Sequence, residues 1–159
     1  MPLRAFLDTC VINWFLDAPE GPALLAEFID GTVRGVVSPE VSEEICATPD
    51  DGRRGRLKAI PQVFFPVSPT LVPVANLARS GVARSAPAGA DALRDELKSI
   101  GFRKLDILHL INAHYSKCDL FITKDKEDIL KISRKAVLET RLAFRILHPA
   151  DLLIELTST

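Results

Sequence analysis

The segment Leu3-Arg4-Ala5-Phe6-Leu7-Asp8 is short and apolar, and it ends in an acidic residue. An apolar run of this length that gives way to a helical pattern is typical of a buried β-strand. The helical pattern follows at once, because apolar residues recur at helical spacing over 11–16 and again over 23–29. Pro19 and Gly21 lie between these two runs and indicate a turn. The start of the chain therefore predicts a strand followed by two helices.

The same alternation continues along the rest of the chain. We expect further strands at 33–37, 63–65, 119–123 and 143–147, and helices at 39–47, 68–79, 91–100, 104–117, near 126 and from 149 onward. The polar, basic stretch 49–60 receives no element, and 80–89 is expected to be a flexible loop because it is rich in Gly, Ala and Ser. Strands that alternate with helices predict an α/β fold with a mainly parallel central sheet. The length of 159 residues fits one domain spanning 1–159.

The charge balance limits how this chain can bind nucleic acid. Lys and Arg number 20 and Asp and Glu number 21, so the formal net charge is −1. A protein that binds nucleic acid through bulk positive charge carries a large basic excess. Any nucleic-acid partner must therefore be held by a local feature of the surface.

Cysteine usage and hydropathy indicate a cytoplasmic protein. The cysteines Cys10, Cys46 and Cys118 are widely spaced and form no Cys-x-x-Cys pair, which argues against a zinc site and suits a reducing compartment. The apolar run near the N-terminus is too short for a signal peptide. Since there is no stretch of about 18 apolar residues, we expect no association with a membrane.

Four acids follow or adjoin the predicted strands: Asp8, Glu44, Asp106 and Asp125. In parallel sheets the functional groups lie beyond the carboxyl ends of the strands, so these side chains are expected to converge. Converging carboxylates repel one another unless a cation neutralises them. Carboxylate oxygens without a His or Cys cluster favour a hard ion such as Mg²⁺ or Mn²⁺, which suits phosphoryl chemistry.

Each acid also has a purely structural interpretation. Asp8 could cap a helix, Asp106 could be an acid favoured by the helix dipole, and Asp125 could lie in a solvated loop. Glu44 competes with Glu40 and Glu43 for its role. Asp106 is the most informative of the four, since it opens an otherwise apolar run in which an unpaired carboxylate would be costly.

Taken in order, these motifs resemble the PIN-domain family of metal-dependent ribonucleases, which includes the toxins of many bacterial toxin–antitoxin pairs. Residues 6–12 (FLDTCVI) resemble the opening motif, and 37–45 (VSPEVSEEI) resemble the second, in which the match selects Glu44 over Glu43. Asp106 with Ala113 resembles the third motif. Residues 120–125 (LFITKD) and 146–152 (ILHPADL) resemble the fourth motif and the closing strand and helix, so the resemblance covers nearly the whole chain.

This resemblance implies a PIN-like three-layer α/β/α sandwich and a metal-dependent endoribonuclease that hydrolyses RNA phosphodiester bonds. It implies that one or two Mg²⁺ or Mn²⁺ ions are held by four acids, with Glu44 acting directly or through water: Asp8, Glu44, Asp106 and Asp125. Thr9 and Thr123 would orient these carboxylates. The family also implies a homodimer and, if the chain is a toxin, an antitoxin partner.

Several further residues are candidates for supporting roles. Basic residues beside the fourth motif are expected to contact RNA phosphate, above all Lys124, Lys126 and Arg134. The basic residues of 53–58 are weaker candidates. Asp128, one turn past Asp125, could be an auxiliary metal ligand but is more simply explained as a surface acid. Cys10 departs from the Asn or Ser of many family members and puts the support of Asp8 in question. His109 shares a helix face with Asp106, where a packed histidine is the commoner outcome.

Other protein classes fit the sequence less well. The main alternative is a catalytically inactive PIN-like module for RNA binding or regulation, against which the four acids argue. A phosphatase of the haloacid-dehalogenase type needs a second Asp two residues after the first, where this chain has Cys10. A receiver-type signalling domain needs an Asp after its third strand, and 63–67 (VFFPV) offers none.

Overall fold

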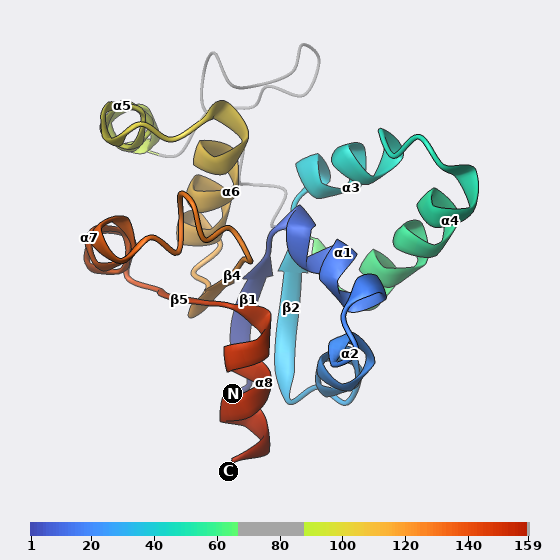
Figure 1. Cartoon of the computed structure of the whole chain (residues 1–159). Helices are drawn as coiled ribbons and strands as arrows, with labels where there is room; N and C mark the ends of the chain where they lie inside the picture. The colour runs from blue at the N-terminus through green and yellow to red at the C-terminus, as the bar shows by residue number, and fades with distance from the viewer. Residues whose placement is uncertain (67–87, 159) are drawn as a thin grey trace.

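The computed structural model describes residues 1–66 and 88–158, and a five-stranded sheet lies at the centre of this part of the chain (Figure 1). The strands are β1 (Leu3–Leu7), β2 (Val33–Val37), β3 (Phe65–Pro66), β4 (Leu120–Ile122) and β5 (Arg145–Leu147). Their order is β3-β2-β1-β4-β5, and each neighbouring pair is parallel. The carboxyl ends of all five strands therefore meet at one edge of the sheet.

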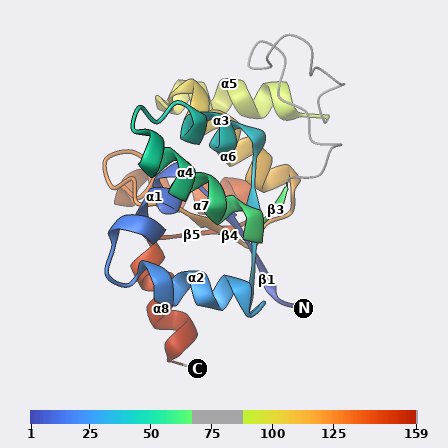
Figure 2. The same cartoon turned by 90° about the vertical axis from the view of Figure 1, so that its right-hand side faces the viewer.

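Helices cover both faces of this sheet. They are α1 (Thr9–Asp17), α2 (Gly21–Ile29), α3 (Pro39–Cys46), α4 (Asp51–Ala59), α5 (Ala90–Ile100), α6 (Lys104–Tyr115), α7 (Ile132–Leu142) and α8 (Pro149–Thr157), with a 3₁₀ turn at Ile60–Val63. Figure 1 shows α5, α6 and α7 to one side of the strands and α1 to α4 to the other. In the view turned by 90°, α2, α3 and α4 lie in front of the sheet (Figure 2).

Alternation along the strands explains the two helical layers. Phe6 of β1 and Phe121 of β4 belong to the core on the side of α5 to α7, and their rings stack with centroids 5.3 Å apart. The neighbouring Leu7 and Ile122 belong to the core on the side of α1, α2 and α8. Successive side chains of a strand point to opposite faces, so two short apolar strands supply both cores. The prediction of a three-layer α/β/α sandwich with a parallel central sheet is confirmed.

Some local predictions need correction. No helix forms near Lys126; residues 126–129 form a turn, and the next helix is α7. The unassigned stretch 49–60 contains α4, and the strand expected at 63–65 begins two residues later as β3. The helix expected at 68–79 and most of the loop expected at 80–89 lie outside the described residues. Among the residues that are described, no helix is long and apolar enough to cross a membrane.

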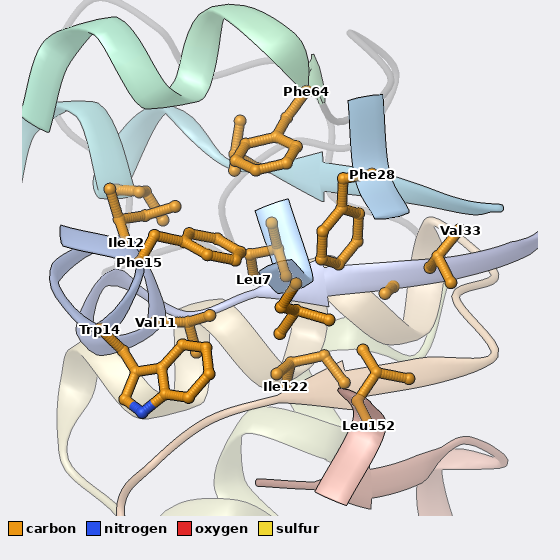
Figure 3. Close-up of a cluster of buried hydrophobic side chains, with 14 of the residues drawn as sticks. Leu7, Val11, Ile12, Trp14, Phe15, Phe28, Val33, Phe64, Ile122 and Leu152 are labelled. Atoms are coloured by element: carbon orange, nitrogen blue, oxygen red, sulfur yellow. The ribbon is translucent and has the colours of Figure 1, made fainter. Parts of the chain in front are cut away.

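A cluster of three phenylalanines packs on β2 opposite Gly35 (Figure 3). Phe28 and Phe64 meet edge to face with centroids 5.4 Å apart, and Phe15 lies 5.9 Å from each. A Cβ atom on Gly35 would lie 2.4 Å from Cδ1 of Phe64, well inside contact distance. The glycine is therefore required by the close approach of the Phe64 ring to the strand.

We expect Gly35→Ala to lower the free energy of unfolding by about 1–3 kcal/mol, because Phe64 and Phe28 must leave their positions in a packed core. Urea unfolding followed by Trp14 fluorescence measures this loss. Gly55→Ala is the matched control, since a Cβ atom there meets nothing within 4 Å and the position is helical. A Gly35→Ala protein as stable as the wild type would contradict the packing described.

Candidate metal centre

The four acids expected at the strand ends all line one cleft of about 690 Å³ at the carboxyl edge of the sheet. Asp8 follows β1, Glu44 lies in the last turn of α3, Asp106 lies in the first turn of α6 and Asp125 follows β4. We call this the acidic cleft; its lining residues are Asp8, Thr9, Cys10, Asn13, Glu44, Arg103, Lys104, Leu105, Asp106, His109, Lys124 and Asp125.

The carboxylate of Asp8 is fixed by hydrogen bonds from neighbouring strand ends. Its backbone N–H donates to the Ile122 carbonyl at 3.1 Å, which continues the pairing of β1 with β4. Its Oδ2 atom accepts a hydrogen bond of 2.8 Å from the Thr123 hydroxyl. Thr123 is fully buried, and its oxygen also accepts from the Asp125 backbone N–H at 3.1 Å. One hydroxyl therefore links two acids of the cleft.

Cys10 supports Asp8 although it is a thiol. The thiol donates a hydrogen bond to Asp8 Oδ2 with an S···O distance of 3.3 Å. Its Sγ atom also accepts from the Lys124 backbone N–H at 3.3 Å. Burial, reinforced by the adjacent Asp8 carboxylate, raises the pKa of the Cys10 thiol to about 12. The thiol therefore keeps its proton at neutral pH and acts as a weak donor to the acid.

Asp106 is the least satisfied acid of the cleft. Its Oδ2 atom is buried and has no hydrogen-bond partner, and the nearest cationic atom, Nε of Arg103, is 3.8 Å away. Burial raises the pKa of Asp106, and the nearby carboxylates of Asp8 and Asp125 raise it further, against the opposing effect of Arg103. A buried carboxylate oxygen without a donor is costly, and a bound cation would satisfy it.

Three aspartates of this region form a compact group, which we call the aspartate triad. Each can offer one oxygen, and these oxygens lie within 4.8 Å of one another: Asp106, Asp125 and Asp128. The turn after β4 shapes this arrangement, since Asp125 Oδ1 accepts from the backbone N–H groups of Glu127 at 3.1 Å and Asp128 at 3.0 Å. Oxygen ligands in a compact group suit Mg²⁺ or Mn²⁺. The triad fits such an ion.

The sequence offered Asp128 as an auxiliary ligand but favoured a surface acid, and the structure groups it with Asp106 and Asp125. Its spacing from Asp125 is the signal that suggested this role, and the structure shows a tight turn in which the Asp125 carboxylate accepts from the Asp128 backbone N–H. Asp128 is also paired with Arg134 and lies 3.6 Å from the guanidinium of Arg103.

Glu44 and His109 form a hydrogen-bonded pair on the opposite side of the cleft. Glu44 Oε1 accepts from the Thr9 hydroxyl at 2.8 Å and lies 3.0 Å from Nε2 of His109. Burial acts to raise the pKa of Glu44, but the hydrogen bonds from His109 and Thr9 outweigh it and hold that pKa below its ordinary value. Burial likewise acts to lower the pKa of His109, and the carboxylates of Glu44 and Asp8 raise it overall.

The basic residues near the cleft differ in whether they line it or are paired with an acid of the protein. Three basic residues line the cleft itself: Arg103, Lys104 and Lys124. Lys126 follows Lys124 by two residues and its side chain is exposed. Arg134 instead pairs with Asp128, and its guanidinium lies 5.1 Å from the centre of the Phe102 ring.

Arginines of the earlier basic stretch are also held within the protein. Arg53 pairs with Asp17 at 2.7 Å and donates to Asn13 at 2.8 Å, and Arg54 donates to the Thr48 carbonyl at 2.7 Å. Sequence reasoning missed Arg103 and Lys104 as cleft residues. The available signal was their position at the start of α6, immediately before Asp106 and at the same edge of the sheet.

Comparison with known proteins supports the fold. No protein-family model and no curated protein match the sequence. A solved structure described as VapBC2 from Rickettsia felis bound to a DNA fragment from their promoter contains a chain of similar fold. The similarity has a TM-score of 0.59 over 92% of this chain and 98% of that chain, at 11% sequence identity. At this identity the likeness concerns the fold alone.

Proposed function

We propose that this chain is a PIN-domain endoribonuclease that requires Mg²⁺ or Mn²⁺ and hydrolyses phosphodiester bonds of RNA. The observation that carries the proposal is the buried, unpartnered Oδ2 atom of Asp106 among the converging acids of the cleft. Such an atom needs a cation, and a hard cation on carboxylates supplies polarisation of phosphate and activation of water. The motif resemblance and the similarity of fold to a chain of the VapBC2 complex support the same assignment.

Each residue of the cleft has a role in this proposal. The cation is held by Asp106 and Asp125, with Asp128 and Asp8 beside them, and Glu44 acts directly or through water. Thr123 and Cys10 orient Asp8, and Thr9 orients Glu44. These supporting groups keep the carboxylates in place before the ion arrives.

RNA is proposed to enter along the basic rim of the cleft. Lys124, Arg103 and Lys104 line the same cleft as the acids and would supply positive charge for an RNA phosphate there. Lys126 is exposed and stays a candidate for the flanking phosphates. Phosphate contact by Arg134 would require its guanidinium to leave Asp128, so its contribution is expected to be the smallest of the basic group.

A protein partner is also part of the proposal. The similar structure is described as a VapBC2 complex on promoter DNA, and the motif resemblance includes toxins of toxin–antitoxin pairs. We therefore propose that this chain acts as the toxin of such a pair, forms a homodimer and is neutralised in the cytoplasm by an antitoxin. Growth arrest on expression, relieved by a neighbouring small gene, would support this part.

The direct test is cleavage of an end-labelled single-stranded RNA by the purified chain. We expect cleavage with Mn²⁺ or Mg²⁺ and none with EDTA, and activity should return when the divalent ion is added back in excess. A protein that binds Mn²⁺ and RNA but leaves the RNA intact would instead support the inactive RNA-binding or regulatory module. A protein that cleaves equally well in EDTA would contradict the metal-dependent assignment.

A further inference from the structure

His109 is a buried histidine inside the acidic cleft and has no role in the proposed hydrolysis so far. It lies on α6 one turn after Asp106, is 2% exposed and packs against the Phe6 ring with centroids 5.7 Å apart. Its Nε2 atom lies 3.0 Å from Glu44 Oε1 and 3.8 Å from Asp8 Oδ1. The ring nitrogen therefore sits between two carboxylates that come from different elements.

The direction of the hydrogen bond between His109 and Glu44 follows from chemistry. An ionised carboxylate can only accept, so Nε2 carries the proton and donates it to Glu44 Oε1. The ring cannot turn freely, because its Nδ1 atom faces the buried Ser38 hydroxyl at 3.5 Å. Thr9 donates to the same Glu44 oxygen at 2.8 Å. Two protein donors therefore already occupy Oε1 of Glu44.

The two sides of the cleft thus differ in whether protein donors satisfy their carboxylate oxygens. On the side of Glu44 and Asp8, hydrogen-bond donors satisfy the carboxylates: Thr9 and His109 for Glu44, and Thr123 with Cys10 for Asp8 Oδ2. On the side of the aspartate triad, Asp125 Oδ1 accepts from two backbone N–H groups and Asp128 pairs with Arg134 and Arg103, but the buried Asp106 Oδ2 has no donor. Of the two sides, the second is the one that leaves a buried carboxylate oxygen for a cation to satisfy.

We infer that His109 is a positioning residue that takes the place of a second cation in the cleft. Its N–H group holds Glu44 and faces Asp8, so the cleft binds one divalent ion, on the aspartate triad, and Glu44 reaches that ion only through water. Two-metal sites place their ions about 3.5–4 Å apart, and a second ion between Glu44 and Asp8 would have to displace this N–H group. The inference rests on the proposed metal-dependent function and specifies the number of ions.

Calorimetric titration with Mn²⁺ alone, in the absence of RNA, tests the inference. We expect one Mn²⁺ per chain for the wild type and two for His109→Leu, because the leucine fills the space without an N–H donor and leaves Glu44 and Asp8 to attract a second ion. His109→Gln keeps an N–H donor and should again bind one. His114→Leu is the matched control on the same helix, since His114 contacts the Leu142 carbonyl at 2.9 Å and does not line the cleft.

A measurement on the wild type keeps the test decisive if His109→Leu does not fold. The imidazole N–H of His109 is observable by ¹⁵N–¹H NMR, and we expect its resonance to persist when Mg²⁺ saturates the protein. Two ions on the wild type, one ion on a folded His109→Leu protein, or loss of the N–H resonance with Mg²⁺ would each overturn the inference. Two ions together with metal-dependent RNA cleavage would leave the proposed function intact, whereas no bound Mn²⁺ at all would overturn both.

Discussion

Asp106→Asn should reduce the metal-dependent cleavage of RNA by at least about 100-fold, which is the scale of losing one charge-stabilising group from an active site. The amide removes the negative charge beside the oxygen that has no protein donor, so the cation loses the ligand that needs it most. Gel-resolved cleavage of a labelled RNA at saturating Mn²⁺ measures the loss. Calorimetry on the same protein should show weaker Mn²⁺ binding.

The same substitution should stabilise the protein when metal is absent. Burial and the carboxylates of Asp8 and Asp125 raise the pKa of Asp106, so the ionised form destabilises the fold and the protonated form does not. In EDTA we therefore expect a Tm above that of the wild type at neutral pH. The difference should shrink as the pH falls into the range where the wild-type carboxyl takes up its proton. A stabilised but inactive variant separates loss of function from loss of folding.

Asp151→Asn is the matched control for both readouts. Asp151 also lies in the first turn of a helix, α8, but it is exposed and lies outside the acidic cleft. It should leave cleavage and metal binding unchanged. If Asp106→Asn retained full cleavage, the assignment of the aspartate triad as the cation site would be wrong.

Thr123→Val should weaken both the site and the fold, because one buried hydroxyl serves two acids. Valine has the same shape but can neither donate to Asp8 nor accept from the Asp125 backbone N–H. The free energy of unfolding should fall by about 1–3 kcal/mol, the cost of leaving buried polar groups without partners. Metal affinity should fall about 10- to 100-fold, as expected when a group that orients the ligands is removed.

Thr123→Ser distinguishes this explanation from a simple packing defect. Serine keeps the hydroxyl and loses only a methyl group, so its metal affinity should stay close to that of the wild type. Mn²⁺ titration and urea unfolding of the two variants give the comparison. If both variants lost metal affinity equally, the hydroxyl would not be the group that positions Asp8 and Asp125.

The sheet and the convergence of the four acids could be predicted because short apolar strands leave a clear pattern. Asp8 follows β1 directly and Asp125 comes three residues after β4, and in a parallel sheet both positions reach the same edge. The acids Asp8 and Asp125 were therefore placed by topology alone. Glu44 and Asp106 were placed by helices that begin or end at that edge.

The sequence did not predict helices α4 and α7, because each of them buries only one or two side chains. Within α7 the buried residues are Leu138 and Leu142, while Ile132 is 88% exposed, so few apolar positions mark the buried face in the sequence. Within α4, Leu57 is the buried residue, and two glycines lower the helix propensity. That helix depends on the Asp50 side chain, which accepts a hydrogen bond from the Arg53 backbone, and on tertiary contacts that local sequence does not reveal.

The parts of the site that the sequence left out or ranked low depend on how side chains are oriented in the folded chain. Asp128 joins the triad because a turn directs it back toward Asp106, and Arg103 reaches the cleft from the residue before α6. His109 was recognised as sharing a face with Asp106, yet its bond to Glu44 joins residues 65 positions apart in the sequence. Contacts of that range follow from how α3 and α6 pack, which spacing along one helix does not contain.

The hydrogen bond between Thr123 and Asp8 joins residues 115 positions apart, and it has a consequence for how activity appears during synthesis. Asp8 is made first, but the members of the triad and the strand that places Asp8 come much later, within residues 106–128. A ribosome-bound fragment that ends before β4 holds at most part of the cation site. If the proposed ribonuclease function holds, cleavage of RNA would therefore begin only when the late strand docks beside β1.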